Sequence, residues 1–380
     1  MDIQELRKEI DGIDSELVAL FRRRMNVSAQ VAAFKKETGK PILDPERERQ
    51  LLTKVSELAG EDMESQTRIL YNLILSLSRS YQGHLLGLDT TLAERVTSAI
   101  SKTESVFPER AVVACQGVEG AYSQLACDKL FSAPSIMYMN SFEGVFQAVD
   151  KGLCRYGILP LENSTAGSVN RIYDLMLSHH FHIVRSTRLH VPHVLVAPKG
   201  ANLGAITQVY SHEQAIQQCS AFLQQFKGVK VHVCENTAMA AKAVAESGRT
   251  DVAAISSESC AALYNLAVLK TDIANVENNY TRFICISKEL EIYPGAQRTS
   301  LMLTLPHKPG ALYAVMAKFY SLGINLIKLE SRPIPGKDFE FMFYFDIDVS
   351  VYSPAFTDLL SQLQTETDSF RYLGSYTEIV

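Results

Sequence analysis

The chain has 380 residues, of which 47% are hydrophobic and 21% are charged, as in an ordinary globular protein. At roughly 150 residues per domain, this length predicts two or three domains. The net charge of −5 argues against a nucleic-acid partner. With no signal-peptide pattern and no apolar run near the roughly 20 residues that cross a bilayer, we expect no membrane association. The seven cysteines form no CxxC pair, which predicts reduced core thiols in a cytoplasmic protein.

The first predicted element is one long helix. Apolar residues recur at steps of three or four from Ile3 to Phe34, apart from one gap of seven. Arg24 fills this gap, so its side chain projects into the middle of the apolar stripe. Arg7 and Lys35 fall at the edges of the stripe.

An unpaired cation in an apolar stripe is costly, so Arg24 needs an anionic partner. Three cations along one stripe favour a bound anionic ligand. The alternative is an arginine that reaches solvent or pairs with a carboxylate such as Asp14 or Glu16. Periodicity does not separate these two interpretations.

Two shorter helices follow. Asp44 is a good N-cap and Pro45 a good first helical residue, so the second helix starts there with Arg47 and Glu48 in its first turns. The third helix, around residues 69–82, carries Ser78 and Gln82 one turn apart, and we expect it to extend into an exposed, polar linker over 87–110. Two short helices cannot bury the apolar face of a helix of over 30 residues, which predicts an intertwined dimer.

Strands and helices alternate from residue 111 onward, which predicts an α/β region of roughly 180 residues. The expected strands are 111–115, 155–160, 182–186, 193–197, 206–210, 229–233, 251–256 and 282–287, and the expected helices are 120–131, 141–151, 168–179, 213–226, 237–247 and 257–265. Several strands end in polar clusters, above all ILPLENSTAG at 158–167. Open α/β sheets bind ligands at such strand ends, although helix capping alone would need only one of these polar residues. The repetition of such clusters suggests two similar lobes that face a cleft.

The C-terminal segment, residues 298–380, has the pattern strand (300–305), helix (310–321), strand (324–331), strand (339–348), helix (354–364), strand (370–375). This βαββαβ order is the ferredoxin-like arrangement. A small dimerisation domain is the plainest interpretation of such a segment.

The helical residues carry a family resemblance. LRKEID, Arg24, Lys35, the Asp44/Arg47/Glu48 group and Ser78/Gln82 resemble the all-helical chorismate mutases. The resemblance implies that Arg7, Arg24, Lys35, Glu48 and Gln82 take part in catalysis and that Asp44, Arg47 and Ser78 bind substrate. Arg7 would act on the partner subunit's site, Lys35 and Gln82 would face the ether oxygen of chorismate, and Glu48 would hold a ring hydroxyl. Arginine forks suit a dicarboxylate that must be held folded for an intramolecular rearrangement.

The α/β segment resembles prephenate dehydratase through four motifs: GAYS at 120–123, PLENS at 160–164, SHEQA at 211–215 and NYTRF at 279–283. The resemblance implies a two-lobed, periplasmic-binding-protein-like fold in which prephenate loses water and carbon dioxide to give phenylpyruvate. It assigns the acid contact with the departing hydroxyl to Thr281. Glu162 is a candidate proton source if burial raises its pKa. The implied substrate-binding or orienting residues are Asn163, Ser164, Ser211, Gln214 and Arg282.

The C-terminal motifs GAL at 310–312 and ESRP at 330–333 resemble the phenylalanine-responsive ACT regulatory domain. The resemblance implies an amino-acid site between paired domains, with phenylalanine as the allosteric ligand. The implied regulatory residues are Gly310, Ala311, Leu312, Glu330, Ser331 and Arg332.

Together the three resemblances follow the order of the bifunctional chorismate mutase–prephenate dehydratases. We therefore predict a mutase domain at 1–88, a linker at 89–109, a dehydratase domain at 110–290 and an ACT domain at 298–380. No cofactor or metal is expected, and the expected assembly is a homodimer or a tetramer. A cytoplasmic two-lobed solute sensor without catalysis, an enzyme with one activity, and a dehydratase that uses arogenate are the alternatives.

Overall fold

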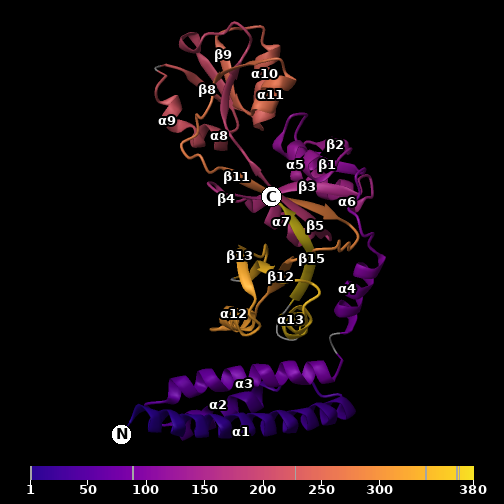
Figure 1. Ribbon diagram of the computed structural model, residues 1–380, viewed down its shortest axis with the longest axis vertical. Helices are drawn as coiled ribbons and strands as arrows, with labels where there is room; N and C mark the ends of the chain where they lie inside the picture. Colours follow the sequence, from indigo (N-terminus) through magenta and orange to yellow (C-terminus); the bar gives the residue numbers. More distant parts are fainter. Residues whose placement is uncertain (1, 88–89, 227, 339, 365–366, 368) are drawn as a thin grey trace. The chain divides into compact units, whose positions relative to one another are not determined.

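The computed structural model describes residues 2–87, 90–226, 228–338, 340–364, 367 and 369–380 (Figure 1). Internal contacts divide the chain into two compact units. The first unit comprises Met1–Ser98 and Met302–Arg371, and the second comprises Ala99–Leu301 and Tyr372–Val380. Within the described ranges, no helix is long and apolar enough to cross a membrane.

The first unit opens with three helices, α1 (Ile3–Thr38), α2 (Pro45–Ala59) and α3 (Glu64–Leu85). A capping box between Asp2 and Glu5 starts α1, and Gly39 ends it at a φ of 66°, a left-handed conformation that favours glycine. The predicted long helix is therefore confirmed. Helix α3 packs against both α1 and α2 (Figure 1).

The apolar stripe of α1 is not covered within one chain. Ile10, Leu17 and Phe34 are 55%, 54% and 55% exposed. On α3, Ile69 and Leu73 are exposed as well. An apolar face of this extent is typical of a surface that packs against another protein.

The segment after α3 differs from the prediction. We expected α3 to continue into the linker, but α3 ends at Leu85 and a separate helix, α4, spans Thr90–Lys102. Leu92, Val96 and Ala99 are buried on one face of α4. These residues are spaced three or four apart, and the polar residues between them hide this periodicity in the composition.

The second unit has two α/β lobes. In the first lobe, β1 (Val112–Gln116) pairs in parallel with β2 (Ser135–Met139) and β3 (Tyr156–Asn163), and β11 (Tyr280–Ser287) lies antiparallel between β3 and β5 (His182–His190). Helices α5 (Tyr122–Leu130), α6 (Phe142–Asp150) and α7 (Asn170–Ser178) accompany this sheet, and the short strand β4 (Gly167–Ser168) pairs with the end of β3.

The second lobe is a five-stranded sheet in the order β10-β6-β9-β7-β8. Its strands are β6 (Val194–Ala197), β7 (Gln208–Ser211), β8 (Lys230–Val233), β9 (Val252–Ser256) and β10 (Ala267–Lys270). The helical elements are η1 (Leu203–Ala205), α8 (Glu213–Gln218), α9 (Ser220–Leu223), α10 (Thr237–Glu246) and α11 (Glu258–Leu263). Neighbouring residues of β6 alternate between two buried clusters, so both faces of this sheet are covered.

Most predicted elements of this unit are confirmed. Strands β2, β4 and β10 were not predicted, and the helix expected over 213–226 is broken at Cys219 into α8 and α9. Two chain crossings, β5 to β6 and β10 to β11, join the lobes. The site described below lies where these crossings meet.

The C-terminal segment contains β12 (Arg298–Thr304), α12 (Ala311–Ser321), β13 (Asn325–Pro333), β14 (Phe341–Asp348), α13 (Pro354–Gln364) and β15 (Ser369–Ile379), so the predicted βαββαβ order is observed. The sheet runs β13-β14-β12-β15, with β13 at its edge. At the end of β15, Thr377, Glu378 and Ile379 pair in parallel with β5 of the first lobe.

Candidate active sites

The helical segment encloses a cavity of about 530 Å³. It contains seven of the eight mutase residues predicted from the sequence: Arg24, Lys35, Asp44, Arg47, Glu48, Ser78 and Gln82. Arg7, the eighth, is exposed on α1 and is not among the lining residues. Three helices therefore bring together side chains that are up to 58 positions apart in the sequence, from Arg24 to Gln82.

Arg24 lies in this cavity with an unused donor. Its Nη1 atom is buried and has no hydrogen-bond partner among the described residues. The Lys35 ammonium donates to the carbonyl of Ile42, and the Asp44 carboxylate caps α2 by accepting from the backbone N–H of Arg47 at 3.0 Å. A buried guanidinium donor without a partner is costly, so the cavity suits an anionic ligand.

Three neutral side chains form the wall beside Arg24. The hydroxyls of Ser28 and Ser78 are 2.6 Å apart, and the Gln82 amide donates to Ser28 Oγ at 3.0 Å. The Gln82 Oε1 atom is buried and has no partner among the described residues. The terminal amide of Gln82 therefore retains one unused polar atom for a ligand.

Sequence reasoning missed Ser28, Arg23 and Arg79, which also line the cavity. Ser28 lies one helical turn after Arg24 on α1, so helical spacing could have placed it there. Arg79 forms an ion pair with Glu48, with 2.5 Å between Nη1 and Oε1.

A second cavity, of about 380 Å³, lies in the second unit. It is lined from both lobes and includes the N-terminal ends of α5 and α10, at Tyr122 and Thr237. Backbone N–H groups at such helix ends favour anions. No lysine or arginine lines this cavity within the described ranges, and Glu235 is the one carboxylate on its wall.

Thr281 and Asn163 face this cavity together. They are paired across β3 and β11, and Asn163 Nδ2 donates to Thr281 Oγ1 at 2.9 Å. The Asn163 Oδ1 atom in turn accepts from the backbone N–H groups of Thr165 and Ala166. The Asn163 amide is thus held with its N–H group directed at the threonine oxygen, which leaves the threonine hydrogen for another acceptor.

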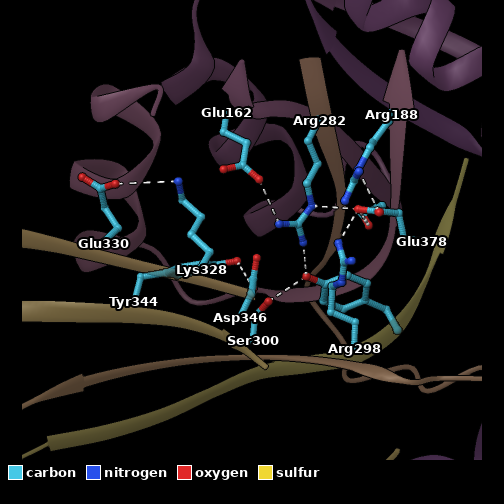
Figure 2. A network of polar contacts seen from close by, with 12 residues as sticks. Glu162, Arg188, Arg282, Arg298, Ser300, Lys328, Glu330, Tyr344, Asp346 and Glu378 are labelled. Atoms are coloured by element: carbon cyan, nitrogen blue, oxygen red, sulfur yellow. Dashed lines mark hydrogen bonds and ion pairs between the residues drawn. The ribbon is translucent and has the colours of Figure 1, made fainter. Parts of the chain in front are cut away.

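Glu162 and Arg282 are the neighbouring cross-strand pair and do not line the cavity. Alternate residues of a strand point to opposite faces of the sheet, so these two side chains lie on the other face. Arg282 is 3% exposed and contacts the carboxylates of Glu162 at 3.3 Å and Glu378 at 3.1 Å (Figure 2). It also donates to the hydroxyl of Tyr376 at 2.7 Å.

Glu378 joins further cations in this network. It pairs with Arg188 at 2.9 Å and with Arg298, and its own side chain is 9% exposed (Figure 2). In this network Arg188, Arg282 and Arg298 form ion pairs, and none of the three lines the cavity. In this structure Arg282 is therefore not placed to bind a substrate carboxylate, and the Glu162 carboxylate is not placed to transfer a proton directly to a ligand.

Of the remaining predicted residues, only Gln214 lines the cavity. The Ser211 hydroxyl is fully buried and donates to the carbonyl of Ile255 at 2.7 Å. The Ser164 hydroxyl donates to the carbonyl of Asn278 at 2.7 Å. Both serines therefore stabilise the backbone in this structure, and neither contacts the cavity.

Gln218 and His193 form a part of this site that the sequence analysis missed, and they contact Asn279, the first residue of the NYTRF motif, to which no role was assigned. The Gln218 amide donates to Thr165 Oγ1 at 2.6 Å and accepts from His193 Nε2 at 2.8 Å and from Asn279 Nδ2 at 3.2 Å. Gln218 lies one helical turn after Gln214, which is the signal that could have identified it. Burial lowers the pKa of His193 and of His212, so both imidazoles are neutral near pH 7.

The C-terminal segment has a smaller cavity of about 140 Å³ at the start of α12. Ala311 and Leu312 line it, and Gly310 caps the helix at a φ of 82°. Glu330, Ser331 and Arg332 lie on β13 and are not among the lining residues.

The described residues contain no cluster of three His, Cys, Asp or Glu side chains that could hold a metal ion. A helical cavity rich in cations and a separate two-lobed cleft centred on a threonine together define an enzyme with two active sites. Comparison with known proteins agrees with this class: the model of chorismate mutase type II matches residues 6–83, and the model of prephenate dehydratase matches residues 113–291.

The chain is 32% identical over 380 residues to the bifunctional chorismate mutase/prephenate dehydratase of Enterobacter agglomerans, covering 98% of this chain and 95% of the relative. It is 36% identical over 301 residues to arogenate dehydratase/prephenate dehydratase 2 of Arabidopsis thaliana, covering 76% and 78%. The prephenate dehydratase of Arthrobacter aurescens, solved with L-Phe, superposes with a TM-score of 0.64 at 28% identity and covers 70% of this chain and 89% of that chain. The protein belongs to the bifunctional chorismate mutase/prephenate dehydratase family and acts in phenylalanine biosynthesis.

Proposed function

We propose that the helical cavity rearranges chorismate to prephenate and that the two-lobed cleft converts prephenate to phenylpyruvate, with the residues described above in specific roles. The observation that carries the mutase site is the buried Arg24 Nη1 atom without a partner, inside a cavity lined by five cationic side chains. A non-catalytic sensor would need neither this cavity nor Thr281. Purified protein given chorismate should accumulate phenylpyruvate, and failure to consume chorismate would contradict the proposal.

In the mutase step the substrate reacts with itself, so the protein must hold it folded and stabilise charge on the breaking ether bond. Arg24 and Arg47 bind the carboxylates, and Asp44 and Ser78 complete the binding wall. Lys35 and the amide nitrogen of Gln82, a donor that contacts Ser28 Oγ at 3.0 Å, face the ether oxygen. Glu48 accepts a hydrogen bond from the ring hydroxyl.

In the dehydratase step, Thr281 contacts the hydroxyl that leaves the ring. Because Asn163 donates to Thr281 Oγ1, the threonine hydrogen is free to donate to the departing oxygen. The ring carboxylate must leave as neutral carbon dioxide. A strong cation on that carboxylate would stabilise the ground state more than the transition state, so a cavity of helix ends and neutral donors suits the reaction better.

Glu162 and Arg282 act on this site indirectly. Their ion pair lies on the opposite face of β3 and β11 and fixes the two strands that carry Asn163 and Thr281. Ser164 and Ser211 fix the neighbouring backbone. In this role Glu162 supports the site, and its carboxylate does not supply the proton.

The assembly is a homodimer in which α1 packs against a second copy of the chain. The exposed apolar stripe of α1 supports this, and so does the position of Arg7, which is exposed and lies outside its own chain's cavity. Arg7 would complete the partner's site. Mixing Arg7→Ala protein with Arg24→Ala protein tests this arrangement, since heterodimers would contain one intact site. Mutase activity in the mixture above the sum of the separate proteins is expected, and no gain after subunit exchange would contradict shared sites.

The C-terminal segment is an ACT domain that binds phenylalanine and inhibits the enzyme. Its βαββαβ order and the cavity beside Ala311 and Leu312 support this, and the edge strand β13, with Ile327 and Leu329 exposed, can pair with a second domain to bring Ser331 and Arg332 toward a shared site. Phenylalanine at millimolar concentration should raise the melting temperature of the protein and lower its dehydratase rate. An unchanged melting temperature would count against the site.

The dehydratase also has a candidate second substrate, arogenate, because the Arabidopsis relative is an arogenate dehydratase/prephenate dehydratase. Comparing kcat/KM for purified prephenate and arogenate decides between them. We place the enzyme in the cytoplasm, where its seven free cysteines would remain reduced.

A further inference from the structure

Arg79 occupies a position in the mutase cavity to which no role has been assigned above. It lies on α3 directly after Ser78, and its guanidinium crosses to α2, where Nη1 contacts Glu48 Oε1 at 2.5 Å. The two side chains are only 21% and 23% exposed, and both line the cavity. The pair therefore links two helices inside the site.

This pair differs from the surface ion pair on the same helix. Arg68 and Glu64 are 3.4 Å apart, one turn from each other on α3, and their side chains are 54% and 47% exposed. Such exposed pairs contribute little, because water screens them. The Arg79–Glu48 pair is more desolvated and shorter, so it constrains the Glu48 carboxylate more strongly.

The charges around the cavity explain why Glu48 needs a partner. The wall has five cationic side chains against two carboxylates, Asp44 and Glu48. Chorismate brings two more negative charges. A carboxylate without a counter-charge beside such a dianion would repel it, and this repulsion grows as water leaves the cavity.

The two oxygen atoms of the Glu48 carboxylate also have different surroundings. Glu48 Oε1 accepts from Arg79, whereas Glu48 Oε2 has no hydrogen-bond partner among the described residues. An ionised carboxylate only accepts hydrogen bonds, so Oε2 is free to accept from a substrate hydroxyl.

We propose that Arg79 is a positioning residue for the mutase reaction: it neutralises Glu48 beside the dianionic substrate and orients Oε2 toward the ring hydroxyl. This inference rests on the proposed role of Glu48 in binding that hydroxyl. Arg79 acts on the substrate through Glu48 and does not itself bind a substrate carboxylate.

A double-mutant cycle on the full-length protein tests the inference. Arg79→Met should lower the mutase kcat/KM about tenfold to a hundredfold, whereas Arg79→Lys, which keeps the charge, should recover most of the loss. In the Glu48→Gln background, Arg79→Met should cost less than about threefold, because its target is gone.

Three controls make the result specific. Arg68→Met removes an arginine of the exposed pair on the same helix and should leave the mutase rate unchanged. Dehydratase turnover of added prephenate should be the same in all variants, and each variant should keep a cooperative thermal transition above the assay temperature, which would exclude misfolding.

Two outcomes separate the possible failures. If Arg79→Met costs as much in the Glu48→Gln background as in the native enzyme, Arg79 binds substrate directly and the positioning role is overturned. If Glu48→Gln alone leaves the mutase rate unchanged, the proposed role of Glu48 fails first, whatever Arg79 does.

Discussion

The two activities of this family share prephenate, which the mutase makes and the dehydratase consumes. The two cavities that we assign to these activities have different linings. The mutase cavity is lined by Arg23, Arg24, Lys35, Arg47 and Arg79. The dehydratase cavity has no lysine or arginine on its wall among the described residues. Under the proposed assignment, the same dianion meets a cationic wall in the mutase cavity and a wall without lysine or arginine side chains in the dehydratase cavity, among the described residues.

The difference follows from the fate of the carboxylates. Both remain in place through the mutase transition state, so cations can hold them without raising the barrier. In the dehydratase one carboxylate leaves as carbon dioxide, and a cation on it would have to be given up during the reaction. The second unit does contain cations nearby, but Arg282, Arg188 and Arg298 are paired with Glu378 (Figure 2).

The largest effect should come from Thr281, the one group in the dehydratase cavity assigned to the departing hydroxyl. Thr281→Val should fold but lower the dehydratase kcat about 10²- to 10⁴-fold, because the acid contact is lost. The mutase rate of the same protein should not change and serves as the internal control. A near-normal dehydratase kcat would remove Thr281 from the mechanism.

Arg24 should show the reciprocal pattern. Arg24→Met removes the unpartnered guanidinium and should lower the mutase kcat/KM about 10²- to 10³-fold, since an oriented charged donor is lost. Turnover of added prephenate at the second cavity should be unaffected. If the mutase retains its rate, the cationic cavity is not the site of the rearrangement.

Glu378 tests whether the cations of the second unit need to be paired. Glu378→Gln removes a carboxylate that pairs with buried Arg282, with Arg188 and with Arg298. Breaking a buried ion pair costs about 3–5 kcal/mol, so thermal or urea unfolding should detect a clear loss of stability. Glu143→Gln, at the exposed pair between Arg171 and Glu143, is the matched control and should change stability by less than about 1 kcal/mol.

The buried His193 of the dehydratase cavity should make the stability of the protein depend on pH. His193 is 3% exposed, and burial lowers its pKa below the ordinary 6.5, so it stays neutral when folded while the unfolded chain takes up a proton. Stability therefore falls as the pH drops below about 6.5, by at most about 1.4 kcal/mol per pH unit for this residue. His193→Gln should flatten the pH dependence of unfolding between pH 6.5 and 5, and an unchanged slope would contradict a buried neutral histidine.

Salt should give the smallest effect and the most direct test of the charge difference. Raising the ionic strength from about 0.05 to 0.5 M screens the cations of the mutase cavity, and its KM for chorismate should rise several-fold. The dehydratase KM for prephenate should change by less than about twofold. Equal sensitivity of the two KM values would show that the cavities do not differ in the way their linings indicate.

Much of the fold was predictable because hydrophobic periodicity is local. The long apolar stripe that predicts α1 also identified Arg24, because a single cation within an apolar stripe can be recognised from the sequence alone. The βαββαβ order of the C-terminal segment was predicted in the same way. Helix α4 was missed because its buried residues are few and separated by polar ones.

The dehydratase site was less predictable from the sequence. Ser164 and Ser211 belong to motifs that suggested substrate binding, yet their hydroxyls bind backbone carbonyls. Gln218 and His193 belong to none of the four motifs. They contact each other, Asn163 and Asn279 only in the folded chain, because the two lobes and the two crossings bring these residues together.

The amino-acid sequence alone determined most of the elements and the cation at the centre of the apolar stripe of α1, because each depends on spacing along one segment. It also indicated the family, through the resemblance of its motifs. Tertiary structure decided which polar side chains face a cavity. Along β3 and β11 a shift of one residue separates Thr281 at the site from Arg282 in an ion pair behind it. The partners on the neighbouring strands, which come from distant parts of the chain, determine which of the two side chains faces the cavity.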